Sequence, residues 1–183
     1  MSHTRTYLDE LIAIACRLDT ADIERMATSL SSSRGRVYII GLGGSMANAI
    51  HMAADLRNLC SLDAYAFSNI AELTARANDE GFDEIFRDWI GKSYPEDKLI
   101  VLSVGGGTST VSNAICRAVE AFQGQVLGIT GPDGGYTAER ADVCIKIPVE
   151  NMKHITPHSE AFQAVIWHCL VSHPLLQKKR TKW

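Results

Sequence analysis

Short apolar, β-branched runs alternate with longer stretches of helical spacing through most of this 183-residue chain. The predicted strands are Val37–Gly41, Ala64–Phe67, Leu99–Val104, Gln125–Thr130 and Val143–Pro148. Strands that are joined through helices run parallel with right-handed crossovers, and the helices then cover both faces of the sheet. We therefore expect an α/β fold, a three-layer α/β/α sandwich around a mainly parallel five-stranded sheet.

The chain before the first strand, residues 1–33, has helical spacing and forms a helical lead-in, with Asp19 or Thr20 as a candidate cap between two helices. Residues 34–175 hold the sheet and its flanking helices, and the last helix is predicted at Pro157–Val171. The length and a hydrophobic content of 46% are enough for one buried core. We expect a single domain over residues 1–183.

Composition excludes several classes of partner. The net charge is −3, so the basic excess that is typical of nucleic-acid binding is absent, and the basic run Lys178–Lys182 is interpreted as a solvated end. No apolar run approaches the ~20 residues that span a bilayer, so we expect a cytoplasmic protein without a membrane partner. The five scattered cysteines form no CxxC pair, which predicts reduced and mostly buried thiols.

Two glycine-rich turns follow two of the predicted strands. The first, Gly41–Ser45, opens a helical stretch, and the second, Gly105–Gly107, is also followed by helical spacing. A helix N-terminus with glycine backbone is a favourable site for a phosphate group. Neither turn matches the Walker lysine motif or the full dinucleotide fingerprint, so a nucleotide is not the expected ligand. Hydroxyl groups accompany both turns, and helix capping is their alternative role: they belong to Ser45, Ser103, Thr108, Ser109 and Thr110.

Histidines and carboxylates share two of the predicted helices. His51 and Asp55 are four residues apart on one helix face, where they could chelate a metal ion or simply form a polar surface pair. Glu160 and His168 lie ~12 Å apart along the last helix, so they could share an ion only by leaning together, and a core or interface histidine is the alternative. Three further histidines carry no assigned role: His154, His158 and His173.

These residues, in this order, resemble the sugar isomerase (SIS) domain family, and within it the sedoheptulose 7-phosphate isomerases, also called phosphoheptose isomerases. The resemblance covers nearly the whole chain. The segments that carry it are Gly41–Ser45, His51–Asp55, Leu73–Ala75, Asn78–Gly81 and parts of Thr130–Asp142. It implies a homotetramer with active sites at subunit interfaces, which interconverts a ketose phosphate and an aldose phosphate.

The resemblance also implies roles for individual residues. The expected reaction converts sedoheptulose 7-phosphate, or a close analogue, to D-glycero-D-manno-heptose 7-phosphate through an enediol. The implied divalent metal is zinc, held by His51, Asp55, Glu160 and His168. Candidate proton-transfer groups are Asp55, His168 and Glu160. The implied substrate-binding residues are Gly43, Gly44, Ser45, Asp79, Ser103, Val104, Gly105, Thr108 and Glu160.

The chain also departs from the family pattern. Asp55 stands for a glutamate and Glu160 for a neutral glutamine, so we hypothesise that Glu160 supplies a charged ligand or a proton-transfer group. Polar family residues are replaced at Leu42, Val104 and Gly105, which leaves an altered sugar phosphate as an alternative substrate. Alternative functions are a non-catalytic SIS module that binds a protein partner and a sugar-phosphate sensor. The presence of both His51 and His168 beside carboxylates favours the enzyme.

Overall fold

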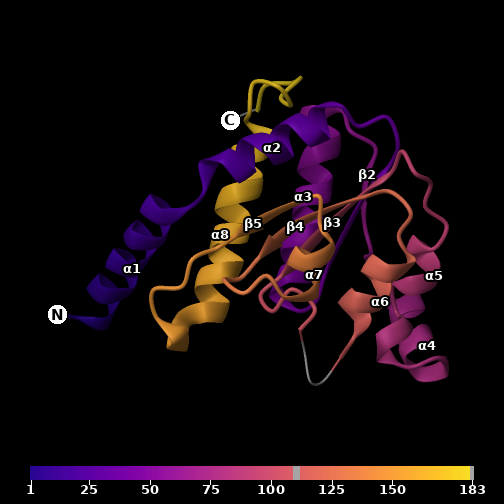
Figure 1. The fold of residues 1–183 in the computed structure, drawn as a ribbon, viewed down its shortest axis with the longest axis horizontal. Helices are drawn as coiled ribbons and strands as arrows, with labels where there is room; N and C mark the ends of the chain where they lie inside the picture. Colours follow the sequence, from indigo (N-terminus) through magenta and orange to yellow (C-terminus); the bar gives the residue numbers. More distant parts are fainter. Residues whose placement is uncertain (109–111, 182–183) are drawn as a thin grey trace.

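The structure is a computed structural model that describes residues 1–108 and 112–181 (Figure 1). Two of the predicted hydroxyl groups, on Ser109 and Thr110, lie outside the described residues, as does Lys182 of the basic run. The described strands form one five-stranded, fully parallel sheet in the order β2-β1-β3-β4-β5. Their bounds are β1 Val37–Gly41, β2 Ala64–Ala66, β3 Lys98–Ser103, β4 Gln125–Thr130 and β5 Val143–Lys146.

Helices connect successive strands, as the alternating sequence pattern predicts. Their bounds are α1 His3–Arg17, α2 Thr20–Ser31, α3 Gly44–Cys60, α4 Ile70–Asp79, α5 Arg87–Ile90, α6 Ala114–Ala121, α7 Gly135–Arg140 and α8 Ile155–Val171, with short 3₁₀ turns at η1 Phe82–Glu84 and η2 Met152–His154. Helix α8 begins before the predicted Pro157, because proline is tolerated in the first turn, where its missing N–H has no intrahelical partner. The predicted α/β sandwich is confirmed.

The sheet has a separate apolar core on each face. Alternate side chains of a strand point to opposite faces, so Val37 and Ile39 enter one core while Tyr38 and Ile40 enter the other. The first core is closed by α2, α3 and α8, and the second by α5 and α6 with partly buried side chains of α4 and α7 (Figure 1). The two cores make the middle layer of the sandwich rigid, which fixes where its strands end.

Helices α3 and α8 lie side by side in the first layer and run in the same direction. At their beginnings, the amide of Asn48 donates to the carbonyl of Glu160 (2.9 Å), and near their ends the Cys60 thiol contacts the carbonyl of Val171 (3.7 Å). In the first turn of α3, the Ser45 hydroxyl accepts a hydrogen bond from the Gln163 amide (3.0 Å). Residues that are more than 100 positions apart in the sequence therefore share one helix–helix seam.

The helical lead-in is present as α1 and α2. Asp19 caps α2 by accepting a hydrogen bond from the backbone N–H of Ala21 (2.9 Å), which confirms the predicted cap. Helix α2 buries four side chains, whereas α1 projects from the body of the molecule and buries only Glu10 and Ile14 (Figure 1). The attachment of α1 therefore depends strongly on polar contacts.

The cysteines are free, but the prediction that most are buried is wrong. All five belong to the described residues, and of these Cys60 is buried, Cys116 and Cys144 are half-buried, and Cys16 and Cys169 are exposed. Cys16 and Cys169 lie on outward-facing positions of α1 and α8, where the helical period and not the residue type decides burial. Within the described chain, no helix is long and apolar enough to cross a membrane.

Candidate functional site

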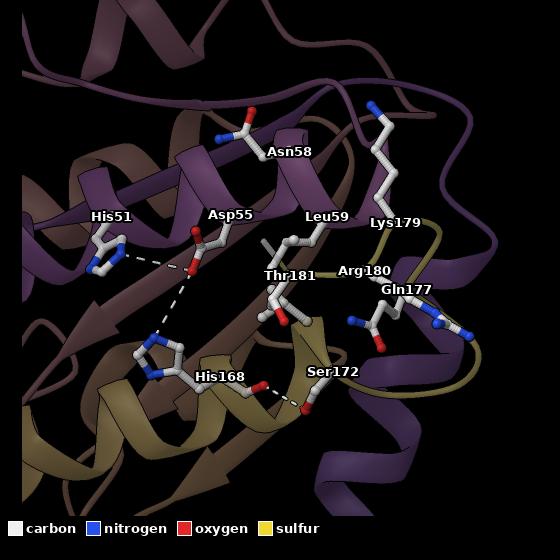
Figure 2. A pocket seen from close by; sticks show the side chains of 11 residues that line it. His51, Asp55, Asn58, Leu59, His168, Ser172, Gln177, Lys179, Arg180 and Thr181 are labelled. Atoms are coloured by element: carbon white, nitrogen blue, oxygen red, sulfur yellow. Dashed lines mark hydrogen bonds and ion pairs between the residues drawn. The ribbon is translucent and has the colours of Figure 1, made fainter. Parts of the chain in front are cut away.

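The seam between α3 and α8 brings His51, Asp55 and His168 together (Figure 2). The Nε2 atom of His51 lies 3.8 Å from Oδ2 of Asp55, and Nε2 of His168 lies 3.9 Å from the same oxygen. The side chains of His51 and His168 are 62% and 55% exposed, and that of Asp55 is 22% exposed. We call these three residues the histidine–aspartate cluster. It forms because helix residues four apart share a face and α8 runs alongside that face.

A cavity of about 820 Å³ opens beside the histidine–aspartate cluster. Its far side is the chain after α8, which folds back so that the backbone N–H groups of Lys178 and Lys179 donate to the carbonyl of Leu59 (2.8 and 3.0 Å). Lys179 and Arg180 line the cavity (Figure 2). The basic run therefore contributes to a pocket, a role that its terminal position and charge did not indicate.

The Trp167 ring packs against the imidazole rings of both His51 and His168. It was not predicted as a site residue. Its ring centroid lies 4.6 Å from that of His51 and 3.5 Å from that of His168. The indole is buried, and its Nε1 has no hydrogen-bond partner within residues 1–108 and 112–181. A rigid aromatic wall restricts the ring positions of the two histidines. The available sequence signal was a large aromatic residue directly before His168.

Glu160 lies away from the histidine–aspartate cluster, although the resemblance placed both in one metal site. It precedes His168 by eight residues, ~12 Å along α8, and its carboxylate lies against the backbone of Gly44. A Cβ atom at Gly44 would come within 2.4 Å of Glu160 Oε2. Glycine at position 44 thus admits a carboxylate to the beginning of α3, where the helix dipole favours negative charge.

The first glycine turn is only partly open. Gly43 precedes α3 with a φ of 59°, and a Cβ there would meet nothing within 4 Å among the described residues. Ser45, in contrast, is buried, and its hydroxyl oxygen accepts the hydrogen bond from Gln163. Helix α3 has no side-chain cap in the described structure, so Ser45 links two helices and does not cap one. Open backbone remains at Gly43, next to the Glu160 carboxylate.

The second glycine turn does not open a helix directly. The N–H of Gly106 donates to the Ser103 hydroxyl (3.0 Å), and Gly106 accepts from the N–H of Thr137 (2.8 Å). Because α6 begins only at Ala114, the expectation of a helix N-terminus at this turn is wrong. The turn still lies at the carboxyl end of β3, beside the end of β1. Its remaining predicted ligand residues, Val104, Gly105 and Thr108, are half-buried or exposed.

Asp79 is the last residue of α4. Its carboxylate is exposed and accepts a hydrogen bond from the Asn78 amide (2.7 Å). Since α4 covers the sheet face opposite to α3 and α8, one chain does not place Asp79 in the histidine–aspartate cluster.

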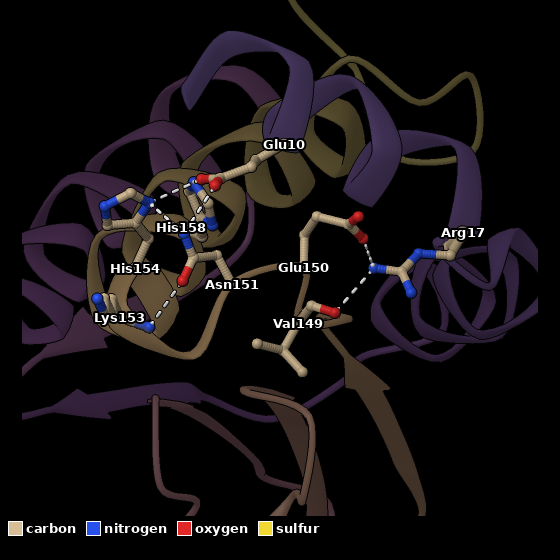
Figure 3. Close-up of polar contacts among 8 residues, drawn as sticks. All are labelled: Glu10, Arg17, Val149, Glu150, Asn151, Lys153, His154 and His158. Carbon is tan, nitrogen blue, oxygen red and sulfur yellow. Dashed lines mark hydrogen bonds and ion pairs between the residues drawn. The ribbon is translucent and has the colours of Figure 1, made fainter. Parts of the chain in front are cut away.

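A second polar cluster joins Glu10 of α1 to His154 and His158 (Figure 3). Hydrogen bonds from Asn151 and His154 lower the pKa of the Glu10 carboxyl, whereas burial lowers the pKa of His158. No role was predicted for these histidines, because Glu10 lies more than 140 positions away and no local spacing connects the three residues.

Comparison with known proteins identifies the family. The SIS domain family model matches residues 6–131, more than half of the chain. The chain belongs to the SIS domain family. A phosphoheptose isomerase from Rhodospirillum rubrum is 35% identical to this SIS domain over 162 residues, which are 85% of this chain and 84% of the relative.

Solved structures give the same result for the fold. A phosphoheptose isomerase from Francisella tularensis matches with a TM-score of 0.79 and 26% identity, over 93% of this SIS domain and 97% of that chain. One from Neisseria gonorrhoeae matches with a TM-score of 0.80 and 24% identity, over 92% and 95% of the two chains.

The donor set of the histidine–aspartate cluster fits a divalent metal ion. In a tetrahedral zinc site, bonds of 2.0–2.2 Å place neighbouring ligand atoms about 3.3 Å apart. The nitrogen–oxygen separations of 3.8 and 3.9 Å are close to that value, and all three ligand atoms lie within 4.8 Å of one another. The exposed side of the cluster faces the cavity, so a fourth position is accessible to substrate or water.

Proposed function

We propose that this SIS domain is an aldose–ketose isomerase of a phosphorylated sugar, with sedoheptulose 7-phosphate or a close analogue as substrate. The observation that carries the proposal is the convergence of His51, Asp55 and His168 beside an 820 Å³ cavity. The phosphoheptose isomerases among its relatives support this substrate class. A cavity of that size is sufficient for a sugar phosphate.

Isomerisation requires that one group remove a proton from carbon and return it to the neighbouring carbon. Asp55 and His168 are the proposed proton-transfer groups, because they are adjacent and both face the cavity. Removal of the C2 proton of the aldose, with protonation of its C1 carbonyl oxygen, would give an enediol. Return of the proton to C1, with loss of the proton on the C2 hydroxyl, would give the ketose. A divalent ion, zinc as we propose, would be held by His51, Asp55 and His168 and would polarise the sugar oxygens.

Glu160 and the glycine turns are the proposed sugar and phosphate contacts. Because the Glu160 carboxylate lies over Gly44, it would repel a phosphate there and accept hydrogen bonds from sugar hydroxyls. We place the phosphate near the second turn, with Ser103, Val104, Gly105 and Thr108. Gly43, Ser45 and Asp79 complete the proposed substrate-binding set.

The exposure of the cluster favours an oligomer. Side chains that transfer protons work best where water is excluded, yet His51 and His168 are more than half exposed in one chain. We therefore propose a homotetramer of single-domain subunits, acting in the cytoplasm, whose interfaces cover the cluster. A neighbouring subunit could bring Asp79 or Glu160 to the site.

Solvent exchange tests the proposed reaction. Protein with a full complement of metal is incubated in deuterated water with sedoheptulose 7-phosphate and with pentulose, hexulose and octulose phosphates. The expected result is deuterium at C2 of one aldose product, at a rate that falls at least about 100-fold in His168→Gln.

His173→Gln is the matched control, because His173 bonds Glu24 outside the cluster (3.1 Å) and its replacement should leave the exchange rate unchanged. Absence of exchange with every sugar would overturn the isomerase proposal and favour a non-catalytic SIS module that binds a sugar phosphate or a protein partner.

A further inference from the structure

The second polar cluster is formed by one carboxylate that faces two imidazoles. Oε2 of Glu10 lies 2.7 Å from Nδ1 of His154 and 3.2 Å from Nε2 of His158. The three ligand atoms lie within 4.8 Å of one another. Figure 3 shows the Glu10 side chain extending from α1 towards the beginning of α8. His158 lies in the first turns of α8, and His154 immediately precedes this helix. Three groups from segments far apart in the sequence thus converge on a common point.

His158 is the unusual member of this cluster. Its side chain is 2% exposed, and neither ring nitrogen has a hydrogen-bond partner within the described ranges 1–108 and 112–181. The Glu10 oxygen is near Nε2 but is not aligned with it as an acceptor. A buried imidazole without hydrogen bonds costs free energy, because it has lost its contacts with water. An ion bound between Nε2 and the carboxylate would compensate for that loss.

The separations suit a small divalent ion of the zinc type. Tetrahedral zinc places its ligand atoms about 3.3 Å apart, and the two contacts to Glu10 lie within about 0.6 Å of this value. The other carboxylate oxygen, Oε1, accepts a hydrogen bond from the Asn151 amide (2.8 Å), which fixes the orientation of the carboxylate. Such a partner around a ligand is typical of protein metal sites. The His154 side chain is 23% exposed and provides a route for entry.

We propose that Glu10, His154 and His158 form a second metal site, for a divalent transition-metal ion of the zinc class, which attaches α1 to α8. His158 and His168 are ten residues apart, ~15 Å along α8, so this site is separate from the histidine–aspartate cluster. Metal binding at His154 Nδ1 displaces the proton that this nitrogen shares with Glu10. Water would occupy the fourth coordination position of the metal ion.

Attachment of α1 is the structural consequence. This helix buries little apart from Glu10 and Ile14, and among the described residues its other long-range polar contact is Arg17 with Glu150 (2.6 Å) and with the Val149 carbonyl (2.8 Å). A metal ion at Glu10 would add a strong bond midway along the helix. Loss of the metal should therefore loosen α1 and leave the sheet intact.

Cobalt titration of metal-stripped, full-length protein tests the site without interference from the other cluster. The background variant is His51→Gln/His168→Gln, which removes two ligands of the histidine–aspartate cluster. This variant should bind about one Co²⁺ per chain with the visible absorption of tetrahedral cobalt. Adding Glu10→Gln and His158→Gln should abolish that absorption and reduce the affinity at least about 100-fold.

Amide hydrogen exchange supplies a second readout in the same background. Zn²⁺ should slow exchange in α1 by about tenfold or more, with little change in the strands, and should have no such effect in the four-residue variant. Circular dichroism verifies that both variants are folded. The proposal is overturned if the His51→Gln/His168→Gln protein binds no Co²⁺, or if the four-residue variant binds it equally well. Because neither readout measures isomerase activity, failure here leaves the proposed function unaffected.

Discussion

Gly43 and Gly106 both have positive φ angles, 59° and 60°, but different surroundings. A Cβ at Gly43 would meet nothing within 4 Å among the described residues, whereas a Cβ at Gly106 would lie 1.9 Å from the Gly134 carbonyl oxygen. Gly43→Ala should therefore cost only the strain of its backbone conformation (φ 59°, ψ −126°), about 1–3 kcal/mol. Gly106→Ala should cost at least about 2 kcal/mol more, because two backbone segments must separate. Urea denaturation of both variants measures the difference in the free energy of unfolding. Equal losses of stability in the two variants would contradict the close approach of Gly106 to Gly134.

Because of the Cys60 thiol, the free energy of unfolding should depend on pH in the alkaline range. Burial, together with the charge of Asp55, raises the pKa of Cys60 from 9.0 to about 11. Above pH 9 the unfolded chain loses the thiol proton while the folded protein keeps it. The contribution of Cys60 to the free energy of unfolding is therefore complete below pH 9 and is lost as pH rises towards 11. We expect Cys60→Ala to flatten the decline in denaturation midpoint between pH 9 and 10.5. An identical slope in the variant and in the unmodified chain would refute this.

At the scale of elements, the seam between α3 and α8 depends on a buried polar chain. Gln163 donates to Ser45 and accepts from the Asn48 amide, both at 3.0 Å. Ser45→Ala leaves the Gln163 N–H without its acceptor, and we expect a loss of about 1–3 kcal/mol in the free energy of unfolding. Ser172→Ala is the matched control, because its hydroxyl is exposed and bonds only to local carbonyls, so the loss should stay below about 0.5 kcal/mol.

The elements themselves were predictable, but the contacts between them were not. Strands and helices follow from local periodicity, which is why β1 and β4 have the expected bounds. The convergence of His51 with His168 depends on how two distant helices pack, and only the family resemblance indicated it. The separation of Glu160 from His168 follows from their eight-residue spacing on one helix, whereas the contact of Glu160 with Gly44 depends on how α3 and α8 pack. The Glu10 contacts with His154 and His158 likewise had no local signal.

At the scale of the whole molecule, assembly should control activity. A homotetramer of 20.0 kDa chains would have a mass of about 80 kDa by light scattering. If subunit interfaces cover the histidine–aspartate cluster, specific activity should fall on dilution as the tetramer dissociates, and Zn²⁺ should restore it only where tetramers persist. Full specific activity in a fraction shown to be monomeric would contradict the proposed interface site.

The return of the chain after α8 has a further consequence. Its two backbone N–H groups bind the Leu59 carbonyl, one of the last carbonyls of α3, which lack partners within the helix. The same segment carries Lys179 and Arg180 into the wall of the cavity. Trypsin cleavage after Lys178 would thus remove one of the two hydrogen bonds to the Leu59 carbonyl together with the cationic rim of the cavity. Proteolytic removal of this end would lower both the affinity for the ligand and the stability of the fold. A cleaved preparation should therefore show both losses at once.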